Sequence, residues 1–231
     1  MANIGSYPLN EIITGDSRLL AQSIPDNSID MIFTDPIYEN IEDYVWLAET
    51  AARILKPTGN LVAFCANKTS LQVANIFAEK LDFCDWLIYR EMARRRKRWD
   101  KSIIGLYEIA CWFSKGDSRL GDFVKNFAYV ANGYVKKDTV HDWAKEPKGI
   151  SNWIDKLSTQ IVYDPFCGGG STAVTCRMFD KDFIGSEINP DSAEIARRHL
   201  SQTMFPLGLG RSLTQRAADG GNAAPEFSNF E

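Results

Sequence analysis

Short apolar runs alternate along this chain with longer segments in which apolar residues recur every three or four positions. The runs at residues 29–34 and 61–65 have the length and the β-branched and aromatic content of buried strands. The segment 44–55 places its apolar side chains on one helical face, and Lys56-Pro57-Thr58-Gly59 is expected to end that helix. Strands that alternate with amphipathic helices are typical of βαβ units. The pattern therefore predicts an α/β fold with a doubly wound, mostly parallel sheet.

The same criteria apply to the rest of the chain. Strands are expected at residues 11–16, 29–34, 61–65, 86–89, 109–113, 161–163 and 183–187, and helices at 17–23, 44–55, 70–81, 150–157, 171–179 and 194–200. Residues 116–143 are polar, aromatic and irregular, which indicates an insertion at 117–143. Residues 206–231 are rich in small and polar residues and are expected to form a disordered tail. We thus expect one domain over residues 1–205.

The amino-acid composition says less about the function than the pattern of hydrophobic and polar residues does. The chain has 231 residues, of which 45% are hydrophobic, and a formal net charge of −4, so binding to nucleic acid would need a local basic patch. The five cysteines form no Cys-x-x-Cys pair, which favours a reducing compartment, and the two histidines have no second ligand at metal-binding spacing. No apolar run is long enough to span a membrane and no signal peptide is evident, so we expect a soluble cytoplasmic protein without a metal.

The first candidate site is a glycine-rich turn between an expected strand and helix. It reads Asp164-Pro165-Phe166-Cys167-Gly168-Gly169-Gly170 and is called the glycine loop below. Gly168 and Gly170 allow a tight turn and close approach to a ligand, and the amides that open the next helix favour a polar or anionic group. Glu187 ends the following apolar run, where a carboxylate suits the hydroxyls of a ribose. A glycine-rich turn without function is the alternative, but the combination favours a nucleoside-containing cofactor.

The second candidate site is Asp35-Pro36-Ile37-Tyr38, called the Asp35 loop below, at the carboxyl end of the strand 29–34. Ligands of open α/β sheets bind beyond the carboxyl ends of the strands, so this loop and Asp16 are expected to face the same cleft as Gly168. An aspartate, free backbone carbonyls and an aromatic ring fit a planar base that carries an amino group. The alternative is an ordinary strand end on which Tyr38 packs.

Together these residues resemble the amino-methyltransferases of DNA, in particular the class often called beta, in which the catalytic motif precedes the cofactor motif. That family has Asp/Ser/Asn-Pro-Pro-Tyr/Phe at the position of the Asp35 loop and Asp-Pro-Phe-x-Gly-x-Gly at the position of the glycine loop, followed by an acid that Glu187 matches. The likeness spans residues 11 to 200. Ile37 replaces the second proline of the family, and Lys145-Glu146-Pro147-Lys148 stands where a Lys-Pro usually opens a helix.

The resemblance implies a Rossmann-like methyltransferase fold and S-adenosylmethionine as the methyl donor. On this basis Asp164, Phe166, Gly168 and Gly170 would form the cofactor loop, Glu187 would bind the ribose and Asp16 would lie near the adenine edge. Asp35 and the Pro36 carbonyl would each accept a hydrogen from the amino group of a flipped-out base, and Tyr38 would stack on that base. An aspartate favours adenine in DNA over N4-cytosine, where the family more often has serine, and a homodimer would also be in keeping with the family.

Three further hypotheses follow from the same residues. A nicotinamide-dependent oxidoreductase would use Gly168-x-Gly170-x-x-Ala173 with Glu187, but too little chain is expected to follow for a complete dinucleotide fold. A non-catalytic DNA-binding subunit would account for Ile37, and RNA as the substrate stays open. A cytosine C5 mechanism would need a cysteine after proline, and the chain has no Pro-Cys.

One segment of this acidic chain is strongly basic. Residues 90–101 hold seven positive residues and two acids, and the central run Arg94, Arg95, Arg96, Lys97 and Arg98 is the expected DNA-phosphate contact. A solvated charged loop is the alternative. Recognition of the DNA sequence would then depend on the insertion 117–143. Its candidate contacts are Tyr129, Asn132, Tyr134, Lys136 and Lys137.

Overall fold

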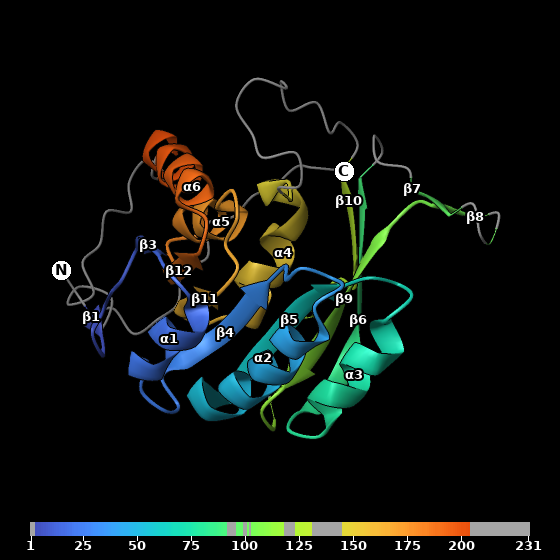
Figure 1. Ribbon diagram of the computed structural model, residues 1–231, viewed down its shortest axis with the longest axis horizontal. Helices are drawn as coiled ribbons and strands as arrows, with labels where there is room; N and C mark the ends of the chain where they lie inside the picture. The colour runs from blue at the N-terminus through green and yellow to red at the C-terminus, as the bar shows by residue number, and fades with distance from the viewer. Residues whose placement is uncertain are drawn as a thin grey trace.

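The computed structural model describes residues 3–91, 96–98, 101, 103–117, 123–130 and 145–203, and it centres on an eight-stranded sheet (Figure 1). The strand order is β10-β6-β9-β5-β4-β11-β12-β3. Within this sheet β9 is antiparallel to β5 and β6, and the other neighbours are parallel. The strands are β3 (Glu11–Thr14), β4 (Ile29–Thr34), β5 (Leu55–Cys65), β6 (Asp82–Glu91), β9 (Glu108–Ser114), β10 (Phe127–Val130), β11 (Ile161–Asp164) and β12 (Asp182–Glu187). The predicted mostly parallel α/β fold is confirmed.

Helices cover both faces of the sheet (Figure 1). One face carries α1 (Ser17–Leu20), the 3-10 helix η1 (Ala21–Ser23), α2 (Ile41–Ile54) and α3 (Ser70–Ala78). The other face carries α4 (Pro147–Leu157), α5 (Ser171–Met178) and α6 (Pro190–Gln202). Two short ribbons lie outside the sheet, β1 (Asn3–Ile4) with β2 (Tyr7–Pro8) and β7 (Arg96–Arg98) with β8 (Ile103–Gly105).

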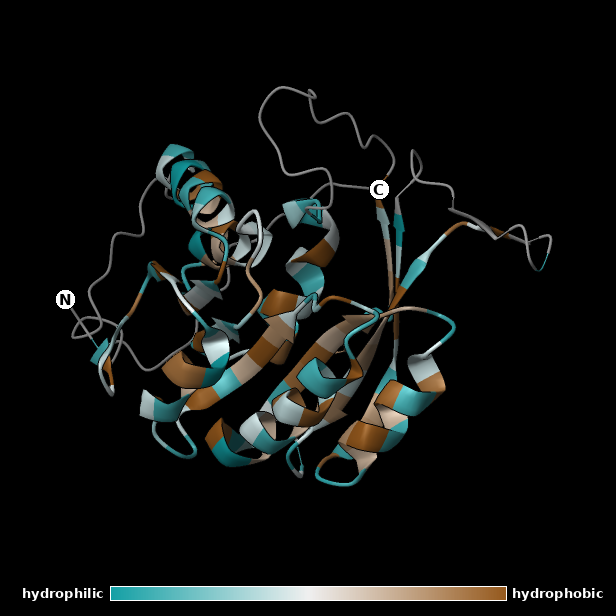
Figure 2. Ribbon diagram, viewed as in Figure 1, coloured by the Kyte–Doolittle hydropathy of each residue, from teal (hydrophilic) through white to brown (hydrophobic). Residues whose placement is uncertain are grey.

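The sheet separates two hydrophobic cores, which explains why its strands are apolar throughout. Along β5, Leu61 and Ala63 pack into the core under α2 and α3, whereas Val62 and Phe64 pack into the core under α4, α5 and α6. Strands buried on both faces are continuous hydrophobic runs rather than alternating ones. Figure 2 shows the same arrangement, with brown, hydrophobic positions along the central strands and teal positions on the outer faces of the helices.

Two segments differ from the sequence-based expectation. Residues 56–59 were expected to form a turn, but they lie within β5, whose pairing with β4 shifts register between Ile29 and Met31. Residues 116–143 were expected to be irregular, but β10 pairs with β6 at the edge of the sheet because its alternating aromatic and small residues can continue the ladder. Residues 118–122, 131–144 and 204–231 lie outside the described residues, and so do Asn132, Tyr134, Lys136, Lys137 and the expected tail.

The strand order brings the candidate residues together at the carboxyl ends of four neighbouring parallel strands. β4 is the parallel neighbour of β11, β11 of β12, and β12 of β3. The carboxyl ends of parallel strands point the same way, so the Asp35 loop, the glycine loop, Glu187 and Asp16 follow one another along that edge. Within the described ranges, no helix is long and apolar enough to cross a membrane, and no group of three or more His, Cys, Asp or Glu side chains could hold a metal ion.

Candidate active site

The two turning glycines of the glycine loop have different surroundings. Both have left-handed backbone angles, with φ 48° at Gly168 and φ 84° at Gly170. A Cβ added at Gly170 would lie 2.9 Å from the Cβ of Ala196, so a glycine is needed there for α5 to pack on α6. A Cβ added at Gly168 would meet nothing within 4 Å. Gly168 therefore presents its backbone to open space, where a ligand can approach closely.

Glu187 extends from the end of β12 across the glycine loop. Its Oε2 accepts a hydrogen bond from the Gly168 amide at 2.9 Å, and its Oε1 accepts one from the Asn189 amide at 2.9 Å. An ionised carboxylate has about four acceptor positions, so these two bonds orient the group without using its full capacity. The partly exposed carboxylate thus lies beside the open side of Gly168.

Asp16 and Phe166 lie at the same edge. The backbone before Asp16 is joined to β12, because the Gly15 amide donates to the Glu187 carbonyl at 2.9 Å. Asp16 itself caps α1, where its carboxylate accepts from the Arg18 amide at 2.9 Å. The half-buried ring of Phe166 meets the ring of Trp46 edge to face, with centroids 5.9 Å apart.

Asp164 lies inside the protein, beneath the glycine loop. Its side chain is buried, and its Oδ1 accepts from Thr34 Oγ1 at 2.8 Å and from the Phe166 amide at 3.2 Å. Burial raises the pKa of Asp164 to about 7, although hydrogen bonds from Thr172, Thr34 and Phe166 oppose that rise. The Thr34 bond ties the end of β4 to the start of the glycine loop. The cofactor contact expected for Asp164 stays a prediction.

At the end of β4, Asp35 forms an ion pair that the sequence did not indicate. Lys145 Nζ lies 2.5 Å from Asp35 Oδ2 and 2.7 Å from Glu108 Oε2. Tyr38 joins the same cluster, because its hydroxyl donates to Glu108 Oε2 at 3.3 Å. Glu108 begins β9 and Lys145 lies two residues before the start of α4, so the cluster gathers residues from three distant parts of the chain.

The cluster is largely buried. The side chains of Lys145 and Glu108 are 6% and 7% exposed, whereas that of Asp35 is 30% exposed. Burial alone would lower the pKa of Lys145, but the charges and hydrogen bonds of Asp35 and Glu108 together raise it, so the ammonium form is maintained. Asp35 Oδ1 is buried and has no hydrogen-bond partner among the described residues. Oδ1 therefore does not contribute to the exposed part of the Asp35 side chain.

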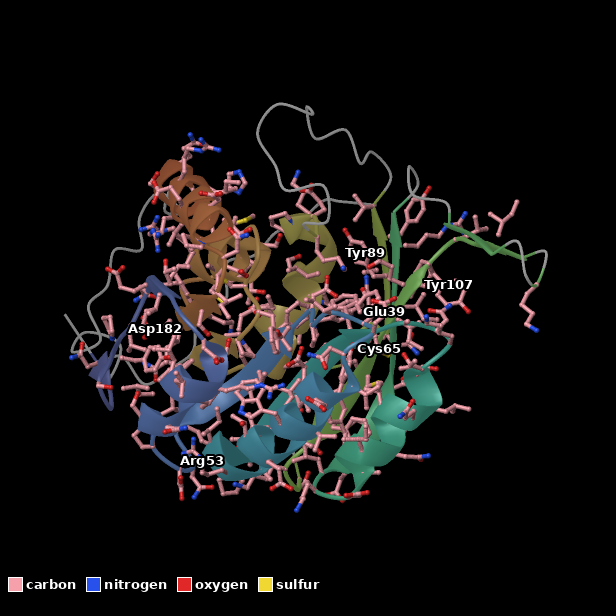
Figure 3. The ribbon with its side chains drawn as sticks, in the orientation of Figure 1. Glu39, Arg53, Cys65, Tyr89, Tyr107 and Asp182 are labelled. Carbon is pink, nitrogen blue, oxygen red and sulfur yellow. The ribbon has the colours of Figure 1, made fainter. Side chains whose placement is uncertain are left out.

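The basic segment and the insertion lie partly outside the described residues. Arg94 and Arg95 are among those not described, and Arg96, Lys97 and Arg98 form β7, whose ribbon with β8 reaches out beyond the end of β6 (Figure 1). Tyr129 on β10 is 49% exposed, and the Arg90 guanidinium lies 5.8 Å from its ring centroid. Figure 3 labels Tyr89 and Tyr107 in this half of the molecule, at the right of the view, and Asp182 at the left, near the opposite end of the strand order.

Comparisons with known proteins agree with this geometry. A family model described as DNA methylase matches residues 150–198, which run from α4 through the glycine loop and Glu187 into α6. The type II methyltransferase M.BglII of Bacillus subtilis is 27% identical over 260 residues, which cover 85% of this chain and 71% of that protein. M.BamHI of Bacillus amyloliquefaciens is 28% identical over 246 residues, which cover 83% of this chain and 57% of that protein. The chain is thus similar in sequence to DNA amino-methyltransferases.

Solved structures extend this similarity to the fold. The structure of M1.HpyAVI in complex with SAM has a TM-score of 0.69 at 21% identity, and the match covers 82% of this chain and 98% of that one. The PvuII DNA methyltransferase, described as cytosine-N4-specific, has a TM-score of 0.70 at 16% identity, with 81% and 85% covered. The expected Rossmann-like methyltransferase fold is therefore confirmed.

Proposed function

We propose that this chain transfers a methyl group from S-adenosylmethionine to the exocyclic amino group of adenine in DNA. The observation that carries this proposal is the adjacency of the Asp35 loop and the glycine loop. They follow the parallel neighbours β4 and β11, and the hydrogen bond between Thr34 and Asp164 joins them at their base. An acceptor held by the first loop and a methyl donor held by the second would meet at one edge of the sheet.

The residues around the glycine loop fit such a donor. Gly168 gives open backbone, the carboxylate of Glu187 beside it suits the hydroxyls of a ribose, and the half-buried Phe166 offers an apolar wall. When bound, S-adenosylmethionine supplies an electrophilic methyl group on a sulfonium. Gly170 shapes the loop through its contact with α6, and Asp16 is the candidate for the adenine edge. The similarity in fold to a methyltransferase solved with SAM supports this assignment.

Asp35 has the chemistry that methylation of an amino group needs. The lone pair of an exocyclic amine is delocalised into the ring, so the amine is a weak nucleophile. When Asp35 and the Pro36 carbonyl each accept one of its hydrogens, the lone pair is directed away from the ring and towards the donor. Asp35, Glu108 and Lys145 together carry one net negative charge, which favours the positive charge that develops on the nitrogen.

DNA would be held next to this edge. A base inside a duplex is inaccessible to the Asp35 loop, so it must be flipped out, and Tyr38 is the candidate to stack on it. The run of basic residues 94–98 follows β6 and is the candidate for phosphate contacts, with the exposed Tyr129 and its neighbour Arg90 on the adjoining strands.

The test is nucleoside mass spectrometry of unmethylated DNA after incubation with the purified chain and S-adenosylmethionine labelled in its methyl group. We expect labelled 6-methyladenine, and no labelled nucleoside from a control DNA composed of dG and dC alone. Labelled 4-methylcytosine would keep the mechanism and overturn the base. Binding of DNA and cofactor without any labelled nucleoside, on DNA or RNA, would favour the non-catalytic alternative that the exposed Ile37 allows.

A further inference from the structure

Lys145 connects the two halves of the candidate active site. Its carbonyl accepts a hydrogen bond from Ser171 Oγ, in the first turn of α5, at 2.6 Å. The next amide, that of Glu146, donates to Tyr89 Oη on β6 at 2.9 Å. With its backbone fixed by these two bonds, Lys145 extends its side chain to Asp35. One residue thus links the helix behind the glycine loop to the Asp35 loop.

The ammonium of Lys145 is enclosed by its partners. Asp35 and Glu108 lie within 2.5 and 2.7 Å of Nζ, and the ring centroid of Phe64 is 4.4 Å away. A buried lysine is stable only when its charge is paired, and here two carboxylates and an aromatic face provide for it. The ammonium therefore has a defined place, and the Asp35 oxygen that it contacts has one as well.

The orientation of Asp35 follows from this contact. Asp35 leaves Oδ1 buried without a hydrogen-bond partner among the described residues, which is unfavourable, while Oδ2 contacts Lys145. Because Oδ1 is buried, Oδ2 is the oxygen that remains available to a substrate. A carboxylate oxygen can accept two hydrogen bonds, so Oδ2 can bind Lys145 and still accept one from an amino group.

We propose that Lys145, balanced by Glu108, is the positioning residue that keeps the Asp35 carboxylate ionised and turned with Oδ2 towards the substrate amine. This inference rests on the proposed function. A protonated carboxyl would offer the amine a donor in place of an acceptor, and a rotated one would present the wrong direction. The Lys145 ammonium prevents both.

The charged and titratable groups around Asp35 determine how this role would be seen in a pH profile. Lys145 and Glu108 approach from the segment before α4 and from β9, Tyr38 lies in the same loop, and Tyr44 on α2 and Asp164 on β11 interact with Asp35 electrostatically. Without Lys145, Asp35 would face the carboxyl groups of Glu108 and Asp164 with no cation between them. The repulsion among these carboxyl groups would then disfavour the negative charge on Asp35.

The experiment measures methyl transfer by the full chain between pH 5 and pH 9.5 for the wild type, Lys145→Met and Glu108→Gln. For Lys145→Met we expect kcat at pH 7.5 to fall by about 10- to 100-fold and the acidic limb of the profile to move up by about one pH unit or more. For Glu108→Gln we expect the acidic limb to move down, because a negative neighbour is lost. Opposite shifts from two members of one buried cluster are not expected from a purely structural role.

Two controls complete the design. Lys56→Met removes the lysine of β5 that pairs with Asp30 of β4, and it should lower the melting temperature without moving the acidic limb. Lys145→Arg keeps the charge and should return the limb towards the wild-type position. Calorimetric titration with S-adenosylmethionine should give dissociation constants within about twofold of wild type for Lys145→Met. If Lys145→Met does not fold, Lys145→Gln takes its place.

An acidic limb that stays in place in the Lys145 and Glu108 variants would overturn the inference. Failure of the proposed function is seen separately, as a wild type that methylates no nucleic acid. In that event carboxyl carbon NMR of the aspartates, assigned with Asp35→Asn, tests the inference alone. At pH 6 the carboxyl carbon shift of Asp35 should lie closer to that of a protonated carboxyl in Lys145→Met than in the wild type, and equal shifts would contradict the role of Lys145.

Discussion

Carboxylates at the amino ends of the parallel strands, called the amino edge, and at their carboxyl ends, called the carboxyl edge, have different surroundings. Asp30 in β4 and Asp35 just after it provide one of each. At its amino end, Asp30 accepts from Lys56 Nζ at 3.0 and 2.9 Å, from the Ile161 amide at 2.9 Å and from the Thr159 hydroxyl. Its side chain is 8% exposed. Asp35, beyond the carboxyl end, pairs with Lys145, keeps one oxygen unpartnered among the described residues and is 30% exposed. Asp30 uses its capacity within the fold, and Asp35 retains some for a ligand.

The strand β12 repeats this contrast. Asp182, where β12 begins, is buried and accepts from Asn10 Nδ2 at 2.8 Å and from Gln160 Nε2 at 3.5 Å. Glu187, where it ends, is partly exposed and holds the amides of Gly168 and Asn189. Asn10 and Gln160 lie just before β3 and β11, at the amino ends of the neighbouring strands, whereas Gly168 lies in the glycine loop and Asn189 caps α6. On the proposed function, the position of a carboxylate along the strand distinguishes those that support the fold from those that contact a ligand.

The largest expected effect distinguishes Asp30, inside β4, from Asp35, which follows it. Asp35→Ala should abolish methyl transfer, and Asp35→Asn should reduce it by about 100-fold or more, because the ionised acceptor is lost. Both variants should keep their affinity for S-adenosylmethionine. Asp30→Asn should leave the rate per folded molecule within about threefold of wild type and lower the free energy of unfolding by about 1 to 3 kcal/mol, since it weakens a buried hydrogen-bonded group. Transfer assays and urea unfolding measure the two quantities.

Retained methyl transfer in Asp35→Ala would remove the assigned role of that residue. A large loss of transfer in well-folded Asp30→Asn would show that the amino edge also takes part, and the distinction between the two edges would not hold.

A second, smaller effect distinguishes the two ends of β12. Glu187→Ala should raise the dissociation constant for S-adenosylmethionine by about 10-fold or more, because hydrogen bonds to a charged group contribute about 1.5 to 3 kcal/mol. Asp182→Asn, the matched change at the other end, should leave that constant within about twofold of wild type. Isothermal titration calorimetry gives both values. An unchanged dissociation constant in Glu187→Ala would refute the ribose contact.

Much of this arrangement could be predicted from the sequence because it depends on local pattern. Buried strands such as 61–65 are continuous apolar runs, and the order of turns and helices places residues 35 and 168 at the same edge. The strand β10 was missed because an edge strand is short and its polar neighbours resemble those of a loop. Its pairing with β6 depends on tertiary contacts that no local pattern contains.

Lys145 and Glu108 were missed for a similar reason. Each is a single charged residue next to an apolar or helical segment, and such residues are usually solvated. They become a cluster only because β9 and the segment before α4 converge on Asp35 across intervals of 73 and 110 residues, counted from positions 108 and 145 to 35. The available signal was an isolated glutamate that opens an otherwise apolar strand, since a strand buried on both faces rarely begins with an unpaired charge.

The smallest effect concerns Asp164, the last residue of β11, whose buried carboxylate accepts only from the neutral donors Thr34, Thr172 and the Phe166 amide among the described residues. Burial raises its pKa to about 7, against about 3.9 in an unfolded chain. The folded state then binds the proton more tightly, so its contribution to stability is complete below about pH 4 and is lost as the pH rises through about 7. In Asp164→Asn the melting temperature should therefore fall less between pH 5 and pH 8 than in the wild type. Thr34→Val removes a donor that lowers this pKa and should make the decrease steeper. Differential scanning fluorimetry across that range measures the slopes, and equal slopes in the wild type and Asp164→Asn would show that Asp164 does not change its protonation in this range.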